Sequence, residues 1–138
     1  MRFLISIPLM CITMFSFSQN LSIKIDSIEL IYLPKTLTAP ISYTKATFLS
    51  IKSDWIKRKI ISDTSVLNNF SDCLNLSSLN MSHDSHKEID VRLVIMIYCE
   101  GKKELDVLVD SIYRYTFLGI THKPEWSFKT WIENQIDW

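Results

Sequence analysis

Glycine is nearly absent from this chain of 138 residues, in which Gly101 and Gly119 are the only two. Phosphate loops of the Walker type and dinucleotide-binding GxGxxG turns therefore cannot be formed anywhere in the sequence. The GxSxG nucleophile elbow of α/β hydrolases is excluded for the same reason. Nucleotide enzymes of those classes and hydrolases built on that elbow are ruled out, and no cofactor is expected.

An excess of one charge is also missing. Fifteen Lys and Arg side chains balance fifteen Asp and Glu side chains, so the formal net charge is zero. Proteins that bind nucleic acid carry basic surfaces that neutralise phosphates, and we therefore expect no nucleic-acid partner. Hydrophobic residues make up 47% of the chain and charged residues 22%, which is typical of a globular domain.

A long apolar run occurs at residues 3–17, directly after Arg2. A cationic start, an apolar core and small residues near its end, here Ser16 and Ser18, are typical of a secretory signal peptide. The run is shorter than the roughly 20 residues that a membrane-spanning helix needs, and an uncleaved anchor is the alternative. We expect residues 1–18 to be a signal that is removed, and the protein to be periplasmic or secreted with no stable membrane span.

The mature chain, residues 19–138, is long enough for one domain with its own core. Cys11 would leave with the signal, so Cys73 and Cys99 remain as a pair in an oxidising compartment. A disulfide between them would close a loop of about 25 residues and stabilise the fold by about 3 kcal/mol. Two separate buried thiols are the alternative.

Apolar periodicity predicts an α+β fold: an antiparallel β-sheet packed on one face by two main helices, a two-layer sandwich. The last helix buries one side through Phe128 and Trp131. Residues 80–87 show no periodicity and are expected to form an exposed loop. A short strand is expected to run into a short helix over residues 43–55. The first main helix should begin at Thr64, after the N-cap Asp63, and end near Leu79, and the second should begin at Lys123-Pro124-Glu125. The other expected strands cover residues 23–33, 57–61, 90–100, 103–112 and 113–120.

The two strands that flank Gly101 are the clearest pattern in the chain. A three-residue loop, Glu100 to Lys102, makes one face of the hairpin apolar, whereas a two-residue loop would set apolar residues against aspartates. We therefore predict the longer loop, with Gly101 in the turn and Gly119 ending the strand before the last helix. The predicted pairs are Cys99 with Lys103, Ile97 with Leu105, Ile95 with Val107, Leu93 with Val109, Met96 with Asp106 and, as a structural pair, Arg92 with Asp110.

His83, His86 and Glu88 form the only cluster in the sequence with metal-ligand character. Two imidazoles three residues apart can share an ion such as zinc, with the carboxylate as a third ligand. The cluster lacks a HExxH helix, and a solvated polar loop is the alternative.

Exposed aromatic and cationic residues suggest an interaction surface. Lys57, Arg58 and Lys59 stand beside Trp55, and Trp126 and Trp138 fall outside the buried side of the last helix. Tryptophan is enriched at binding hot spots. A solvated strand edge and ordinary packing are the alternatives.

Three segments occur in a characteristic order: Phe17-Ser18-Gln19 at the end of the signal, then residues 25–29 with Tyr32 and Pro34, and later residues 89–92. This order of features is similar to that of small exported bacterial proteins of uncharacterised activity. The chain resembles these proteins over most of its mature length, which implies export and an α+β fold. Our leading hypothesis is a non-enzymatic exported domain that binds a protein or an envelope component through sheet edges or exposed aromatics. The second is a small exported hydrolase or metal-dependent enzyme that uses residues 83–90.

Overall fold

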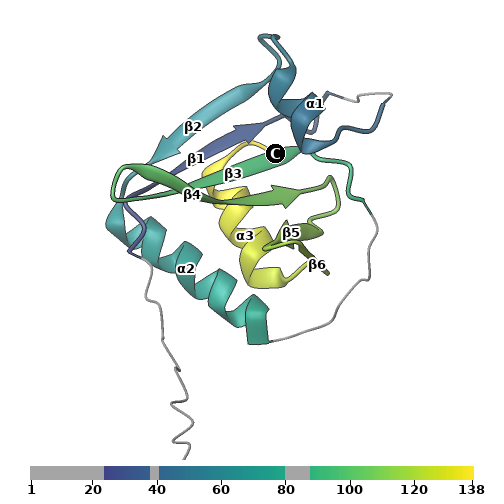
Figure 1. The fold of residues 1–138 in the computed structure, drawn as a ribbon. Helices are drawn as coiled ribbons and strands as arrows, with labels where there is room; N and C mark the ends of the chain where they lie inside the picture. Colours follow the sequence, from purple (N-terminus) through teal and green to yellow (C-terminus); the bar gives the residue numbers. More distant parts are fainter. Residues whose placement is uncertain (1–23, 38–40, 80–87) are drawn as a thin grey trace, which may run out of the picture.

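Figure 1 shows the computed structural model of the chain, which describes residues 24–37, 41–79 and 88–138. Within these ranges six strands form one sheet in the order β2-β1-β3-β4-β5-β6, and every neighbouring pair is antiparallel. The predicted α+β fold is confirmed. The elements are β1 (Ser27–Tyr32), α1 (Lys45–Ser50), β2 (Lys57–Ile61), α2 (Thr64–Leu79), β3 (Leu93–Cys99), β4 (Lys102–Val109), β5 (Tyr115–Phe117), β6 (Ile120–His122) and α3 (Trp126–Gln135).

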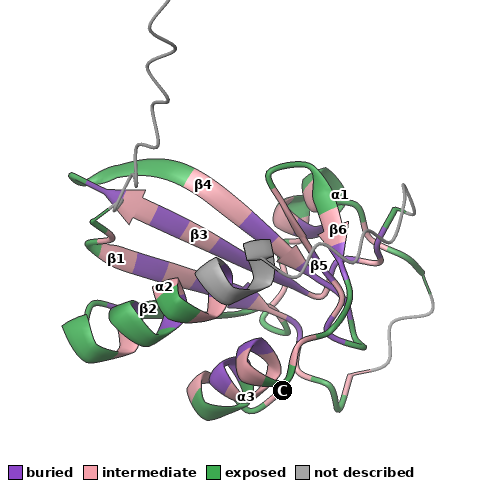
Figure 2. Ribbon diagram, turned by 90° about the horizontal axis from the view of Figure 1, so that it is seen from below, coloured by how far each residue is buried: buried purple, intermediate pink, exposed green. Residues whose placement is uncertain are grey.

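Different elements contact the two faces of the sheet (Figure 2). Ile95 of β3 belongs to a large buried cluster that includes Phe70 of α2 and Phe128 of α3. Its neighbour Val94, which points to the other face because side chains alternate along a strand, belongs to a smaller cluster with Phe48 of α1. A two-layer sandwich is therefore too simple a description, since α1 adds a partial third layer.

The turn between β3 and β4 corrects the predicted three-residue loop. It consists of Glu100 and Gly101, with φ angles of 51° and 72°. Two consecutive positive φ angles suit a two-residue hairpin turn, in which glycine is favoured at the second position. Cys99 consequently pairs with Lys102 and not with Lys103.

A β-bulge then returns the hairpin to the register expected from its apolar pattern. Lys103 pairs with Tyr98 and Leu105 with Ile97, so Glu104 is the extra residue of β4. The apolar face thereby keeps facing the core despite the shorter turn. The predicted pairs Ile97–Leu105, Ile95–Val107, Leu93–Val109 and Met96–Asp106 are all present.

Arg92 and Asp110 lie just beyond the last paired residues of this hairpin. An Arg92 guanidinium nitrogen lies 2.5 Å from the carboxylate of Asp90. Asp110 forms its ion pair with Arg114, at 2.6 Å, and also accepts a hydrogen bond from the backbone N–H of Arg114. Each residue therefore forms its ion pair with a residue close to it in sequence.

The strand predicted over residues 113–120 is in fact the start of a second hairpin. Leu118 and Gly119 have φ angles of 50° and 77° and turn the chain from β5 into β6. Gly119 therefore joins two short strands and does not end the sheet. Tyr115 of β5 is fully buried and pairs with His122 of β6.

The helix ends follow local side-chain chemistry. Asp63 accepts hydrogen bonds from the backbone N–H groups of Ser65 and Val66, which confirms it as the N-cap of α2. The short strand expected near residues 43–47 is absent, because Thr44 and Thr47 form a capping box that starts α1 there. No helix in the described part of the chain is both long and apolar enough to cross a membrane.

Candidate functional site

The cationic run at the start of β2 does not form a single patch. Successive strand residues point to opposite faces, and Arg58 places a guanidinium nitrogen 2.9 Å from Glu29 of β1. Lys59, on the other face, donates to the carbonyl of Gln135 at the end of α3. A cation is favourable there because helix C-terminal carbonyls lack partners within the helix. Two of the three cations therefore stabilise the fold itself.

Two large apolar side chains remain exposed at this edge of the sheet. Trp55 is 66% exposed just before β2, and Ile60 is 73% exposed within it. Because β2 is the outermost strand on its side, one row of its backbone N–H and C=O groups points away from β1. We call the surface formed by Trp55, Ile56, Arg58 and Ile60 the β2 edge.

A shallow depression adjoins the β2 edge. It has a volume of about 820 Å³ and lies where the chain passes from α1 into β2. Its lining combines the apolar Ile51 and Ile56 with the charged Lys52, Asp54 and Arg58. The β2 edge thus offers backbone hydrogen-bonding groups beside a concave surface that is partly apolar.

The other predicted aromatic anchors lie elsewhere. Trp126 is 80% exposed, but it follows β6, at the opposite edge of the sheet from β2. Trp138 is packed against the fold: its indole N–H donates to the carbonyl of Leu33 at 3.1 Å, and its ring meets Tyr113 edge-on at 5.0 Å. The structure therefore separates the three tryptophans instead of gathering them on one surface.

Cys73 and Cys99 form no disulfide with each other, so of the two alternatives the structure has two separate thiols. Cys99 ends β3 at the hairpin turn, whereas Cys73 lies in α2 and hydrogen-bonds to Ser127 of α3. The two thiols therefore meet different elements around the same core. Burial raises the pKa of both thiols, so they are protonated near neutral pH and poorly nucleophilic.

The predicted metal ligands His83 and His86 lie outside the described residues, and Glu88 is exposed. Within residues 24–37, 41–79 and 88–138, no group of three His, Cys, Asp or Glu side chains is placed to hold a metal ion. His122 is buried, and its ring stacks on Tyr115 with the centroids 4.9 Å apart. His122 therefore packs in the core, and the metal or hydrolase hypothesis remains a prediction.

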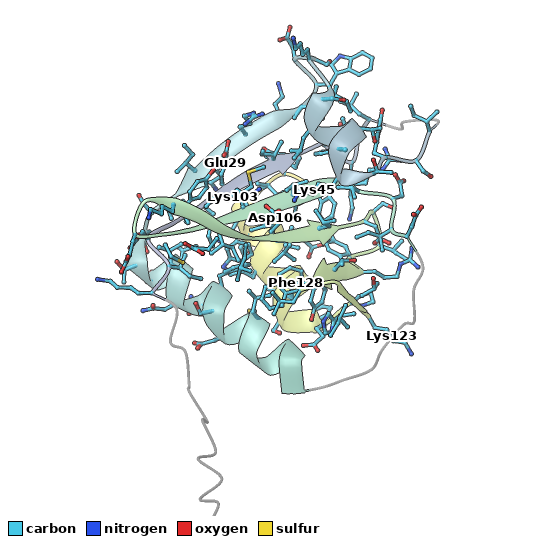
Figure 3. All side chains as sticks on the ribbon, viewed as in Figure 1. Glu29, Lys45, Lys103, Asp106, Lys123 and Phe128 are labelled. Carbon is cyan, nitrogen blue, oxygen red and sulfur yellow. The ribbon has the colours of Figure 1, made fainter. Side chains whose placement is uncertain are left out.

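An ion cluster on the face that carries α1 was not expected (Figure 3). Lys103 of β4 lies 2.9 Å from one Asp106 oxygen, and Lys45 of α1 contacts the other. Burial alone would raise the pKa of Asp106, but hydrogen bonds from the two lysines outweigh it and hold that pKa below its usual range. The cluster ties α1 to the sheet.

A second polar cluster surrounds Tyr113, which is buried and has a φ of 65°. Its hydroxyl accepts a hydrogen bond from Lys35 at 2.6 Å and donates one to Glu133 of α3. Burial, followed by the nearby Glu133 carboxylate, raises the pKa of Tyr113, so the hydroxyl is neutral. Lys35 and Tyr113 are 78 residues apart in sequence, and no local pattern could have indicated this contact.

Comparison of the chain with protein-family models, with curated proteins and with solved structures finds no match in any of the three.

Proposed function

We propose that this protein is an exported, non-enzymatic binding domain that holds an extended segment of a partner protein along the β2 edge. The observation that carries the proposal is an outermost strand in which Ile60 is 73% exposed, with the 66% exposed Trp55 two residues before the strand begins. Exposed apolar edge strands are ordinarily avoided because they recruit other chains. A partner strand would bind through backbone hydrogen bonds, a known mode of peptide recognition.

Charge around the β2 edge indicates the character of the partner segment. Lys52 and Lys57 are exposed there, with Asp54 as a nearby acid, while Arg58 is paired with Glu29. Rim cations accelerate association with acidic partners and disfavour basic ones. We therefore infer a partner segment that carries acidic residues beside an apolar residue able to contact Ile60.

The test uses the full chain produced in its native host with a photoreactive side chain in place of Ile60. A matched protein carries the same group in place of Ile112, which is 59% exposed and lies between β4 and β5. We expect a specific cross-linked protein from position 60 that is missing from position 112. Identical products from both positions, or no product from either, would refute the proposal.

The affinity of the cross-linked partner then tests the contact itself. Ile60→Glu places a carboxylate against an acidic segment and removes apolar contact, so we expect binding to weaken by about tenfold or more. Ile112→Glu should bind as the parent protein does. Equal affinities of the two variants would show that the β2 edge is not the binding surface.

A further inference from the structure

A small pocket opens beside Tyr113, and no residue of the β2 edge lines it. Its volume is about 200 Å³, which is room for about seven waters at roughly 30 Å³ each. The segment that follows β1 supplies most of the lining, and single residues near the ends of β3, β4 and the chain complete it. The lining residues are Leu33, Pro34, Lys35, Leu37, Arg92, Ser111 and Trp138.

The polar walls of this pocket are held in place. The Lys35 ammonium donates to the Tyr113 hydroxyl and lies 4.1 Å from the centre of the Tyr113 ring and 5.3 Å from that of Trp138. The Arg92 side chain is only 13% exposed, and its Nε and Nη2 donate to Asp90. Because these cations are already oriented, a ligand would lose less side-chain entropy on binding than at a mobile surface lysine.

The strained backbone of Tyr113 supports this arrangement. A φ of 65° is uncommon for a bulky residue, and such conformations persist only where surrounding contacts enforce them. Here the strained residue is 6% exposed, and its hydroxyl joins Lys35 to Glu133. The result is a positioned ammonium group in the lining of the pocket, with donor capacity beyond its bond to tyrosine.

The charges around the pocket favour an anion. The charged side chains in its lining are Lys35 and Arg92. Arg92 is paired with Asp90, whereas Lys35 donates to the uncharged hydroxyl of Tyr113. The further pair Arg114–Asp110 is internally balanced. Lys35 therefore brings a positive charge to a lining that also contains an indole and aliphatic side chains.

We propose that this pocket binds a small monocarboxylate with an apolar or aromatic body. The carboxylate would accept hydrogen bonds from Lys35 and the Ser111 hydroxyl, near the positive charge of Arg92, while the body packs against Trp138 and Leu37. A pocket of about 200 Å³ is smaller than the roughly 300–1,000 Å³ of sites for drug-sized molecules, so the ligand has a single ring or a short chain. This site is independent of the β2 edge, and either proposal can fail alone.

Titration of the full-length protein with 3-phenylpropionate tests the site by NMR. The signal followed is the indole N–H of Trp138, assigned by its loss in Trp138→Phe. We expect saturable shifts of that signal, and at least about tenfold weaker binding of the uncharged analogue 3-phenylpropanamide, because a charge-assisted hydrogen bond is lost. This comparison uses only the unaltered protein, so it does not depend on the stability of any variant.

Two lysine variants provide the matched comparison. Lys35→Gln should bind 3-phenylpropionate at least about tenfold more weakly. Lys123→Gln should bind as the parent protein does, since Lys123 follows β6 and is not among the residues that line the pocket. Absence of saturable binding would overturn the proposal. Equal binding of the acid and the amide, or unchanged affinity in Lys35→Gln, would overturn it as well.

Discussion

The same substitution at two adjacent isoleucines at the end of β2 should change the stability of the protein by very different amounts. Ile60 is 73% exposed, whereas Ile61 is 5% exposed and pairs with the fully buried Ile28. Threonine preserves the β-branched shape that strands favour, so Ile→Thr changes burial and polarity while leaving strand propensity nearly constant. Comparing the variants therefore separates the role of Ile60 in binding from any role in folding.

The expected magnitudes follow from the two environments. Exposed substitutions usually change stability by less than about 0.5 kcal/mol, and we expect that for Ile60→Thr. Ile61→Thr loses apolar volume worth about 0.5–1.5 kcal/mol and buries a hydroxyl that costs about 1–3 kcal/mol if unpaired. The sum is a destabilisation of about 1.5–4.5 kcal/mol, a large part of the roughly 5–15 kcal/mol that stabilises a typical domain.

Urea unfolding of the parent and both variants, followed by circular dichroism, measures these differences. With a slope of about 1–3 kcal/mol per molar urea, the midpoint of Ile61→Thr should fall by about 0.5 M or more. That of Ile60→Thr should stay close to the parent. Equal shifts in the two variants, or the larger shift in Ile60→Thr, would refute the assignment of Ile60 to the exposed face and with it the basis of the β2 edge.

Two further predictions concern ionisable groups. Because the folded-state pKa of Asp106 is depressed, its ion pairs with Lys45 and Lys103 stabilise the fold above the unfolded pKa of about 4 and are lost as pH falls through the lower folded value. Asp106→Asn should therefore lower stability at pH 7 by about 1–2 kcal/mol, given partly exposed lysines, and flatten the acid limb of the stability profile; an unchanged acid limb would contradict this. Cys73 and Cys99 should both react with an alkylating reagent after denaturation without reductant, and a mass spectrum in which neither is modified would show that they are bonded.

Local sequence predicted those elements that depend on neighbouring residues. Asp63 identified the start of α2 because an N-cap acts within one helical turn. The apolar alternation around Gly101 identified the β3–β4 pairing, since burial of one face specifies register. The turn length was predicted wrongly because a bulge at Glu104 compensates for the shorter loop, and the alternation alone cannot distinguish the two solutions.

The candidate sites were less predictable, since their residues are distant in sequence. Trp55 was identified from composition and is exposed, whereas Trp138, chosen on the same grounds, packs against Leu33 and Tyr113. The sequence did not indicate a role for Lys35, because its partner Tyr113 lies 78 residues further along the chain. Residue type alone therefore could not distinguish an exposed indole from a packed one.

By itself, the sequence determined the fold class and most element positions, and its two glycines excluded glycine-rich phosphate loops and the GxSxG elbow. These features depend on composition and short-range periodicity. Tertiary structure decided which side chains meet. It divided Arg58 and Lys59 between opposite faces of β2, placed Cys73 and Cys99 so that they form no disulfide, and brought Lys35 to Tyr113. The physical reason is that strand order and helix docking set these long-range contacts, and neither is encoded in any single segment of the chain.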